Sequence, residues 1–164
     1  MVRSRLASLL VVTVLGAMLS GCALTLGRPA PLGTGQVHAR VVTGAGGARL
    51  VLVPVYISGR GPYDFALDTG AARTVVDTRL SNLLHLPASG PEQTVTGVAG
   101  TVEAVRVRIS DWRVDTITLP STTVLSLRLA AGGGPPLDGL FGSDMLSRFR
   151  TVTIDYAGQT VTLS

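Results

Sequence analysis

An apolar strand that runs directly into an aspartate most constrains how this chain can fold. Residues 65–67 (Phe-Ala-Leu) are followed at once by Asp68, Thr69 and Gly70. A carboxylate at the mouth of a buried strand is costly to ionise, and a hydroxyl and a permissive glycine backbone follow it. On these residues alone two interpretations stay open: a strand that ends in an ordinary Asx-type turn, or a functional carboxylate held at a strand end.

The composition favours a single β-rich domain. The chain has 164 residues, which is enough for one domain with a real core. Aromatic residues make up only 4% of it and glycine occurs 20 times, so small β-branched residues and glycine turns dominate. The apolar patterns predict two short helices, at residues 78–85 and 144–149, and strands at 37–42, 49–58, 63–67, 74–76, 94–96, 101–109, 112–119, 122–127, 151–156 and 160–163.

Single residues sharpen these expectations. Pro54 lies inside a long apolar run, which indicates a sheet edge or a bulge, because proline donates no ladder hydrogen bond. Asp77 or Thr78 is expected to cap the first helix. Ser143 is the expected N-cap of the second helix, with Asp144 in its first turn, where the helix dipole favours an acid.

The charge pattern argues against a nucleic-acid partner. All 14 basic residues are arginines, against 10 acidic residues, which gives a formal charge of +4. Without Arg3 and Arg5 of the amino-terminal segment, 12 basic residues face 10 acidic ones and the charge is +2. The arginines are scattered and no aromatic residues interleave with them, unlike the basic patch of a nucleic-acid interface.

Residues 1–21 have the pattern of a secretory signal peptide. Arg3 and Arg5 precede an uncharged apolar run at residues 6–19, which is shorter than the roughly 18–20 residues of a membrane span. The only cysteine, Cys22, follows Leu-Ser-Gly, which resembles the bacterial lipobox. The resemblance implies cleavage before Cys22 and lipidation of its thiol and new amino group. A free redox thiol is the weaker alternative for Cys22.

The lipobox resemblance also implies a location in the cell envelope. Ala23, rather than aspartate, follows the cysteine, which by resemblance to sorted lipoproteins favours the outer membrane, facing the periplasm. Residues 22–36 are rich in glycine and proline and predict a flexible tether. The predicted domain organisation is therefore a signal peptide at 1–21, a tether at 22–36 and a folded domain at 37–164.

A glycine-flanked hairpin tip stands near the middle of the folded part. Gly97, Val98, Ala99 and Gly100 lie between the predicted strands 94–96 and 101–109. Glycines at both ends make such a tip mobile. Two interpretations are open: a flap over a cleft, or an ordinary hairpin.

Four features in order resemble the retropepsin-like aspartic protease family, over roughly residues 50–163. They are the strands from residue 53 into Asp68-Thr69-Gly70-Ala71, the strand 74–76, the hairpin tip 97–100, and Leu140-Phe141-Gly142 with the helix after it. The resemblance implies an all-β fold: a closed barrel or sandwich with a flap hairpin and one or two short helices.

The resemblance implies an aspartic endopeptidase. The family's chemistry uses two carboxylates that share a proton, yet this chain has one Asp-Thr-Gly run, because Asp138 and Asp155 stand in different contexts. It therefore implies a homodimer in which Asp68 meets its own copy, with Thr69 and Gly70 shaping the two loops. No metal or organic cofactor is implied.

The polypeptide substrate would lie extended in a cleft. The residues that the resemblance places against it are Gly97, Val98, Ala99, Gly100, Leu140, Phe141 and Gly142, and their apolar members favour apolar substrate side chains. The competing hypothesis is a non-catalytic envelope lipoprotein that binds extended peptides in the same cleft, since a fold does not by itself imply a function.

Overall fold

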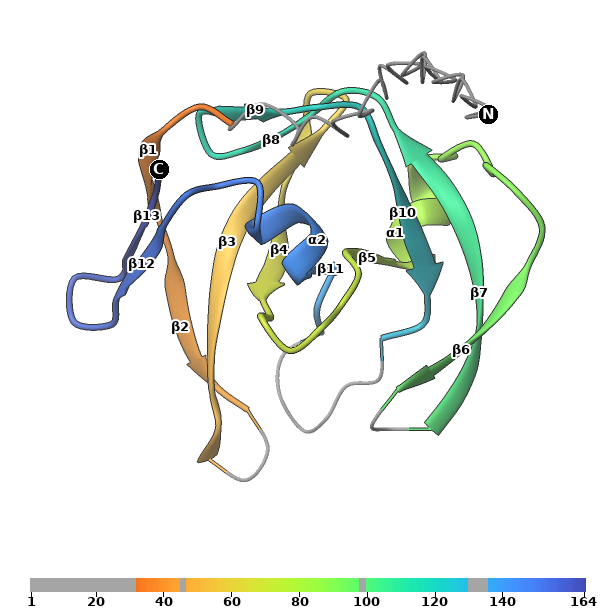
Figure 1. The fold of residues 1–164 in the computed structure, drawn as a ribbon, viewed down its shortest axis with the longest axis horizontal. Coiled ribbons are helices and arrows are strands. Elements are labelled where there is room, and N and C mark those ends of the chain that lie inside the picture. Colours follow the sequence, from red (N-terminus) through yellow and green to blue (C-terminus); the bar gives the residue numbers. More distant parts are fainter. Residues whose placement is uncertain (1–31, 45–46, 98–99, 130–135) are drawn as a thin grey trace, which may run out of the picture.

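The computed structural model describes residues 32–44, 47–97, 100–129 and 136–164, and they form a predominantly β fold (Figure 1). The elements are β1 (Gly35–His38), β2 (Arg40–Thr43), β3 (Arg49–Ile57), β4 (Arg60–Leu67), β5 (Val75–Asp77), α1 (Thr78–Leu83), β6 (Gln93–Gly97), β7 (Gly100–Ile109), β8 (Trp112–Val114), β9 (Ile117–Leu119), β10 (Thr122–Leu127), β11 (Gly139–Phe141), α2 (Ser143–Leu146), β12 (Val152–Asp155) and β13 (Thr160–Leu163). The predicted all-β class is confirmed.

One large sheet runs through most of the molecule. Its strand order is β6-β7-β10-β5-β11-β4-β3-β8-β9, and β2 pairs with β3 outside this path. Figure 1 shows β2, β3 and β4 on one side of the molecule and β10, β7 and β6 on the other. The short strands β5 and β11 and the helix α2 lie between these two groups.

The strand β11 is inserted between two strands that precede it in the chain. It runs parallel to β4, with Phe141 opposite Leu67, and antiparallel to β5, with Leu140 opposite Val75. The loop of residues 68–74, which connects β4 to β5, therefore has to pass around the end of β11. We call it the Asp68 loop, and the order of these strands determines its position.

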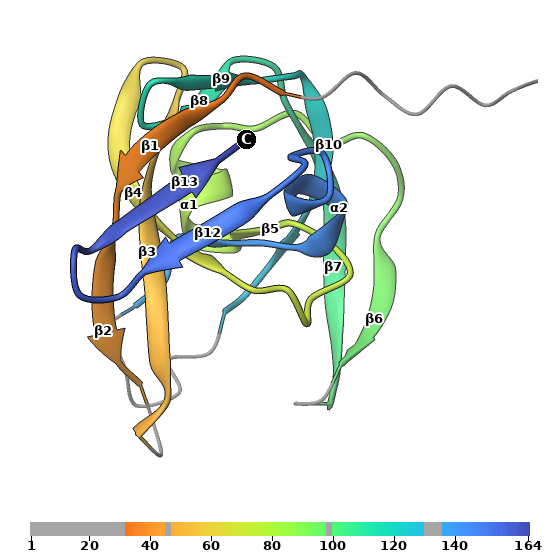
Figure 2. The same ribbon diagram turned by 60° about the vertical axis from the view of Figure 1, so that its left-hand side comes forward.

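A separate three-stranded sheet joins the two ends of the folded part. Its order is β1-β13-β12, and Figure 2 shows β13 between the other two strands. The register places Gly35 opposite Leu163 and His38 opposite Thr160. The predicted terminal hairpin is thus present, and its second strand pairs with β1 of the same chain.

The core is apolar and has an aromatic centre. The ring centroid of Phe141 lies 5.3 Å from that of Phe65 and 5.7 Å from that of Trp112. Trp112 is 1% exposed, and its indole Nε1 donates to the carbonyl of Pro120 at 2.8 Å, so its single polar atom is paired, as burial requires. Aromatic rings from β4, β8 and β11 thus hold three strands of the large sheet together.

Two predicted strands are divided in the structure. The predicted strand 37–42 breaks at Ala39, because the chain there leaves the small sheet and begins to pair with β3. The predicted strand 112–119 breaks at Asp115, which has a positive φ of 50°, a conformation that aspartate tolerates better than most residues. The result is the tight hairpin of β8 and β9.

Pro54 lies at the point in β3 where one side of the strand changes partners from β2 to β8. On that side β2 pairs with β3 only as far as Leu52, and β8 begins to pair only at Val55. The register with β4 shifts between Val55 and Ile57. The expectation of an edge or a bulge is confirmed, because the missing N–H of Pro54 falls in the gap between two partners.

Both predicted helices are present, and both are shorter than expected. Asp77 caps α1, as expected, by accepting from the backbone N–H of Arg79. The predicted N-cap of α2 is wrong: Gly142 holds the N-cap position, Ser143 is the first helical residue, and no side chain caps the helix. The carboxylate of Asp144 makes a tertiary hydrogen bond instead, as described below.

Several expectations concern residues outside the described part. The signal peptide, Cys22 and two thirds of the tether fall in residues 1–31, and Val98 and Ala99 also lie outside. The end of the predicted tether is ordered instead, because Gly35 and Gln36 belong to β1. Within the described ranges no helix has the length and apolar character needed to cross a membrane.

Candidate active site

Asp68 follows the last residue of β4 and begins the Asp68 loop. Its backbone N–H donates to the carbonyl of Phe141 at 3.0 Å, which extends the pairing of β4 with β11 by one residue. The backbone of Asp68 is therefore fixed to the centre of the sheet. The sequence expectation of a carboxylate at the end of a buried strand describes this position correctly.

The carboxylate of Asp68 is held by the backbone of its own loop. Its Oδ1 accepts from the N–H of Gly70 at 2.9 Å and from that of Ala71 at 3.1 Å. Among the described residues, Oδ2 has no hydrogen-bond partner, and the side chain is half-buried. One oxygen thus orients the group while the other is free to react, an arrangement that both open interpretations, Asx turn and functional acid, would produce.

Gly70 and Thr69 shape the outer side of the loop, and both are exposed. A Cβ on Gly70 would lie 3.3 Å from Oδ1 of Asp68, which is closer than an ordinary van der Waals contact. Glycine therefore lets the backbone approach the carboxylate. Thr69 stands at the surface of the loop, where a second molecule could reach it.

The far end of the loop is attached to α2 through Thr74, which is 1% exposed. Both the backbone N–H of Thr74, at 2.9 Å, and its Oγ1, at 2.7 Å, donate to Oδ1 of Asp144. The N–H of Gly142 in turn donates to Oγ1 of Thr74 at 3.2 Å. The N–H of Ser143 donates to the carbonyl of Ala71 at 2.8 Å. Four hydrogen bonds thus fix the loop to the segment after β11.

The strand β11 and the residue that follows it pack tightly against β4 and the Asp68 loop. A Cβ on Gly142 would lie 2.4 Å from the carbonyl carbon of Arg73, and a Cβ on Gly139 would lie 2.3 Å from the ring of Phe65. Only glycine fits either place without a shift of the backbone or of a buried ring. Gly142 thus allows the backbone after β11 to approach the Asp68 loop closely.

The structure corrects part of the predicted substrate wall. Phe141 is 3% exposed and its ring packs in the aromatic core, so it cannot line a cleft. Successive residues of a strand face opposite sides, and the half-buried Leu140 therefore points the other way, where it packs with Val75 and Leu125. Gly142 is buried against the Asp68 loop, so it also offers no surface to a substrate.

The two glycines of the predicted hairpin tip lie in β6 and β7, on either side of the undescribed residues 98 and 99. Gly97 pairs with Gly100, and the antiparallel pairing continues along the two strands to Gln93 opposite Ala104. Gly97 is the last residue of β6 and Gly100 the first of β7, whereas both were expected in the tip, outside the strands. In the sheet order β6 is an outermost strand, so one of its sides is open to a further strand.

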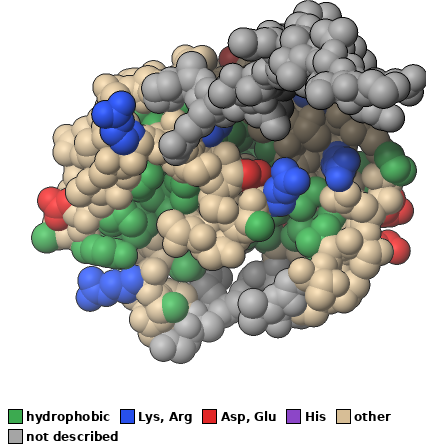
Figure 3. Space-filling view, in the orientation of Figure 1, with side chains coloured by type: hydrophobic (Ala, Val, Ile, Leu, Met, Phe, Trp, Pro, Cys, Tyr) green, Lys and Arg blue, Asp and Glu red, His purple; other side chains and the backbone are tan. Residues whose placement is uncertain are grey.

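A pocket of about 660 Å³ lies between this hairpin and the Asp68 loop. Its walls come from the loop, β6, β7, β10 and α2, and include Arg73, Thr74, Val95, Arg106, Leu125 and Asp144. Asp68 itself is not part of the lining. Figure 3 shows basic side chains beside exposed hydrophobic ones on this face, over the region where Figure 1 draws β7 and β10.

Sequence reasoning did not identify the lining of this pocket. Arg73 follows the Asp-Thr-Gly run closely; it is exposed, and it also lines the pocket. Arg106 carries no local signal, because only the pairing of β7 with β6 and β10 brings it to this place.

A second buried acid near the sheet serves a structural purpose. The carboxylate of Asp77 is fully buried, and its burial alone would raise its pKa. Hydrogen bonds from Arg79, at 2.7 and 2.8 Å, and from the N–H of Leu129, at 2.9 Å, outweigh burial and lower the pKa of Asp77. Asp77 is thus kept as a paired anion that holds α1 and the end of β10.

The described residues contain no group of three His, Cys, Asp or Glu side chains placed to share a metal ion. The site consists of one oriented carboxylate on a loop that is fixed at both ends, beside an open polar pocket. Such a group can act as a general base or acid on water.

Comparisons with known proteins agree with this geometry. A crystal structure of a retropepsin-like aspartic protease from Rickettsia conorii superposes with a TM-score of 0.52 and 16% sequence identity, covering 80% of this chain and 99% of that one. At this identity the likeness shows the fold. No curated protein sequence matches the chain. The sequence profile described as "Aspartyl protease" matches residues 53–145, more than half of the chain. The chain therefore belongs to the aspartyl protease family, on a retropepsin-like fold.

Proposed function

We propose that the protein is an aspartic endopeptidase that acts as a homodimer, with Asp68 of each copy forming one half of the catalytic pair. The observation that carries the proposal is the state of Asp68: one oxygen is oriented by two loop N–H groups, and the other is unpaired among the described residues. The family membership supplies the class of reaction.

The same chain does not supply a second carboxylate for the pair, because three other acids already have hydrogen-bond or ion-pair partners. Asp144 accepts from Thr74. Asp138 accepts from the N–H of Asp64 at 3.0 Å. Asp77 is paired with Arg79. A two-fold dimer with Asp68 beside the axis would supply the missing group, because residues near the axis of a symmetric interface meet their own copies.

The chemistry follows from two carboxylates at hydrogen-bonding distance. They cannot both be ionised at low cost, so they share one proton. The ionised member takes a proton from a water molecule, whose oxygen attacks the scissile carbonyl carbon. The protonated member donates a hydrogen bond to the carbonyl oxygen and later gives its proton to the leaving amine. Thr69, exposed beside the carboxylate, would form hydrogen bonds to the partner's loop.

An extended polypeptide fits the geometry around the pair. The open side of β6 can accept a further strand, and main-chain hydrogen bonds of this kind bind extended peptides independently of their sequence. Side chains of the bound peptide would alternate between the pocket beside the Asp68 loop and the opposite side.

We further propose that the enzyme works at the bacterial cell envelope, anchored by lipid on Cys22 in the outer membrane and facing the periplasm. The support is the sequence pattern around Cys22. A lipid anchor would also raise the effective concentration of two copies that associate weakly.

The test is a mixing experiment with the full chain in detergent and an unfolded protein as substrate. Asp68→Asn alone should abolish cleavage. Added in equal amount to the wild type, Asp68→Asn should lower the wild-type activity by roughly half, because it captures wild-type subunits in inactive dimers. Asp111→Asn, an exposed acid outside the site, is the matched control and should leave both results unchanged.

Three outcomes would contradict the proposal in different ways. Full activity of Asp68→Asn would show that the carboxylate of Asp68 is not needed for cleavage. Activity that is proportional to wild-type concentration and unaffected by added Asp68→Asn would contradict the homodimeric active form. Peptide binding without turnover by the wild type would favour the competing non-catalytic lipoprotein.

A further inference from the structure

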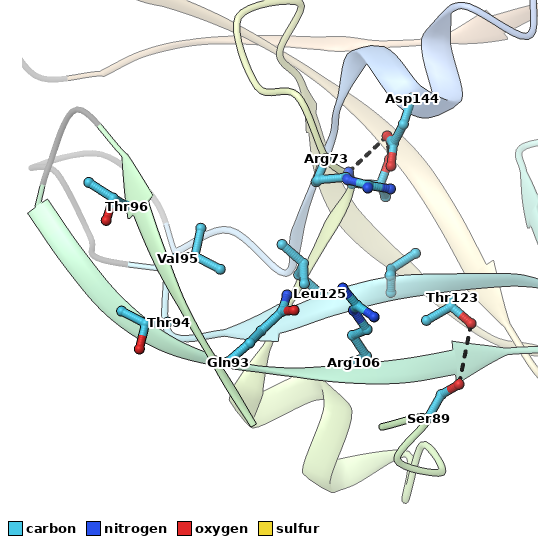
Figure 4. Close-up of a pocket in the computed structure, with 12 residues that line it drawn as sticks. Arg73, Ser89, Gln93, Thr94, Val95, Thr96, Arg106, Thr123, Leu125 and Asp144 are labelled. Atoms are coloured by element: carbon cyan, nitrogen blue, oxygen red, sulfur yellow. Dashed lines mark hydrogen bonds between the residues drawn. The ribbon is translucent and has the colours of Figure 1, made fainter. Parts of the chain in front are cut away.

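Two arginines face the pocket beside the Asp68 loop from opposite walls. Arg73 belongs to the loop itself, and Arg106 belongs to β7 of the hairpin. Figure 4 shows Arg106 and Gln93 extending from the hairpin strands toward the side of the pocket where Arg73 and Asp144 lie. The pocket is thus open to solvent between two guanidinium groups.

Neither guanidinium is paired with an acid of this chain. All ten acidic residues lie in the described ranges, and the ion pairs found there involve only Arg40, Arg79 and His38. The one acid in the lining, Asp144, already accepts two hydrogen bonds from Thr74. Two positive charges therefore face one engaged carboxylate.

The rest of the lining suits a polar side chain on an extended backbone. Gln93 and Ser89 add polar groups on the hairpin side, while Val95 and Leu125 provide apolar contacts for an aliphatic stem. The volume of about 660 Å³ is ample for a large side chain. An unpaired guanidinium is a strong donor to a carboxylate, because its planar fork matches the two oxygens.

The pocket is also close to the reacting group along the chain. Arg73 is on the same loop as Asp68, and both ends of that loop are fixed by hydrogen bonds. A peptide that pairs with β6 advances about 3.3 Å per residue. A side chain within a few residues of the scissile bond can therefore reach this pocket.

We propose that Arg73 and Arg106 make this pocket a subsite for a carboxylate of the peptide substrate. The carboxylate belongs either to an aspartate or glutamate side chain near the scissile bond or to a free C-terminus. The inference rests on the proposed function for its role in cleavage, while the binding of the carboxylate can be measured without turnover.

The binding test uses the full chain as Asp68→Asn, which prevents cleavage. The probes are fluorescein-labelled ten-residue apolar peptides that carry one Glu, Gln or Lys at successive positions, with the C-terminus either amidated or free. We expect at least one Glu position, or the free terminus, to strengthen binding by about fivefold over the neutral peptide, the range of a partly exposed ion pair. The preference should weaken as salt is added.

Charge changes in the pocket identify the groups responsible. Arg106→Glu and Arg73→Glu should each remove the preference for a carboxylate and shift it toward the Lys peptides, whereas Arg106→Lys should retain it. The matched control is Arg108→Glu, an exposed position on the same strand outside the lining, which should retain the wild-type preference. The same peptides are then offered to active wild-type protein, and cleavage is measured by mass spectrometry.

The outcomes separate the two proposals. Cleavage with no preference for a carboxylate at any position overturns the proposed subsite but is consistent with the proposed protease activity. A carboxylate preference in binding without any cleavage supports the subsite and overturns the protease. A preference that Arg108→Glu removes as completely as Arg106→Glu does overturns the subsite, because it would reflect the overall charge. The amidated and free peptides decide which source of carboxylate is bound.

Discussion

The hydroxyl of Thr74 donates a 2.7 Å hydrogen bond to Oδ1 of Asp144, and this bond connects the Asp68 loop to α2. Thr74 ends the loop that Asp68 begins, so the pair fixes the loop from its far side. The two residues are 70 positions apart in the sequence, and they meet because β11 is inserted between β4 and β5. A hydrogen bond at the far end of the loop thus helps to determine where the reactive carboxylate stands.

Replacement of Thr74 by valine should weaken both the fold and the site. The substitution keeps the shape but removes the donor to Asp144 and the acceptor for the N–H of Gly142. A buried polar group left unpaired costs about 1–3 kcal/mol, so urea unfolding should show a loss of that size. Thr118→Val, on the exposed side of β9, is the control and should change stability little. Equal stability of the two variants would show that the bonds to Thr74 contribute nothing.

Gly142→Ala should misplace the Asp68 loop. The backbone of Gly142, with φ −84° and ψ 174°, suits any residue, so the cost is purely steric. The new methyl group would lie 2.4 Å from the carbonyl carbon of Arg73, and overpacking of this kind costs about 1–3 kcal/mol. Thermal unfolding and peptide cleavage should both decline. Gly33→Ala is the control, because a Cβ at Gly33 meets only a side-chain methyl at 3.9 Å. An equal loss of stability and cleavage in Gly33→Ala would contradict the steric argument.

The Asp77–Arg79 pair should stabilise the protein in a pH-dependent way. Although burial opposes it, the hydrogen bonds from Arg79 and Leu129 lower the pKa of Asp77 below the ordinary value of 3.8. A lowered folded-state pKa adds stability that is fully present above the unfolded-state pKa and is lost as the pH falls through the folded-state pKa. Asp77→Asn should therefore cost about 1–3 kcal/mol at neutral pH.

The stability gap between wild type and Asp77→Asn should stay constant from neutral pH down to about 3.8 and shrink below that value. Urea unfolding across this pH range measures it. Asp111→Asn, at an exposed position, should show no comparable gap at any pH. A gap that is independent of pH would mean that Asp77 acts through its shape and its neutral hydrogen bonds alone.

Cys22→Ser should release the protein from the membrane. If Cys22 carries acyl chains, the wild type should partition into the detergent phase and the variant into the aqueous phase, because more than one chain is needed for stable anchoring. Thr25→Ser, just beyond the cysteine, should behave like the wild type. Detergent partition of Cys22→Ser equal to that of the wild type would reject the lipid anchor.

Much of the fold could be predicted because local patterns and tertiary structure agree. The apolar run into Asp68 predicts a strand that ends in an oriented carboxylate, and the N–H groups of Gly70 and Ala71 hold it there. The prediction that Asp77 caps α1 was correct because this role depends on Arg79, only two residues away. Such features are fixed by neighbours in the sequence.

The errors arose where distant residues decide the structure. Serine is a common N-cap residue, which is why Ser143 was predicted to cap α2. In the structure Gly142 is the N-cap, and Asp144 accepts a hydrogen bond from the distant Thr74. Phe141 was expected in a cleft wall, and the stacking with Trp112 turns it inward. The arginines of the pocket come together only through strand pairing, which no local pattern around Arg106 records.

The central place of β13 in the small sheet also affects how the protein is made. Strand β1 emerges from the ribosome early but has no partner until β13 has been synthesised far downstream. The strand β1 therefore stays unpaired until the whole chain is available, and contacts of such long range close slowly. A chaperone that shields β1 during this interval would protect the newborn protein from aggregation.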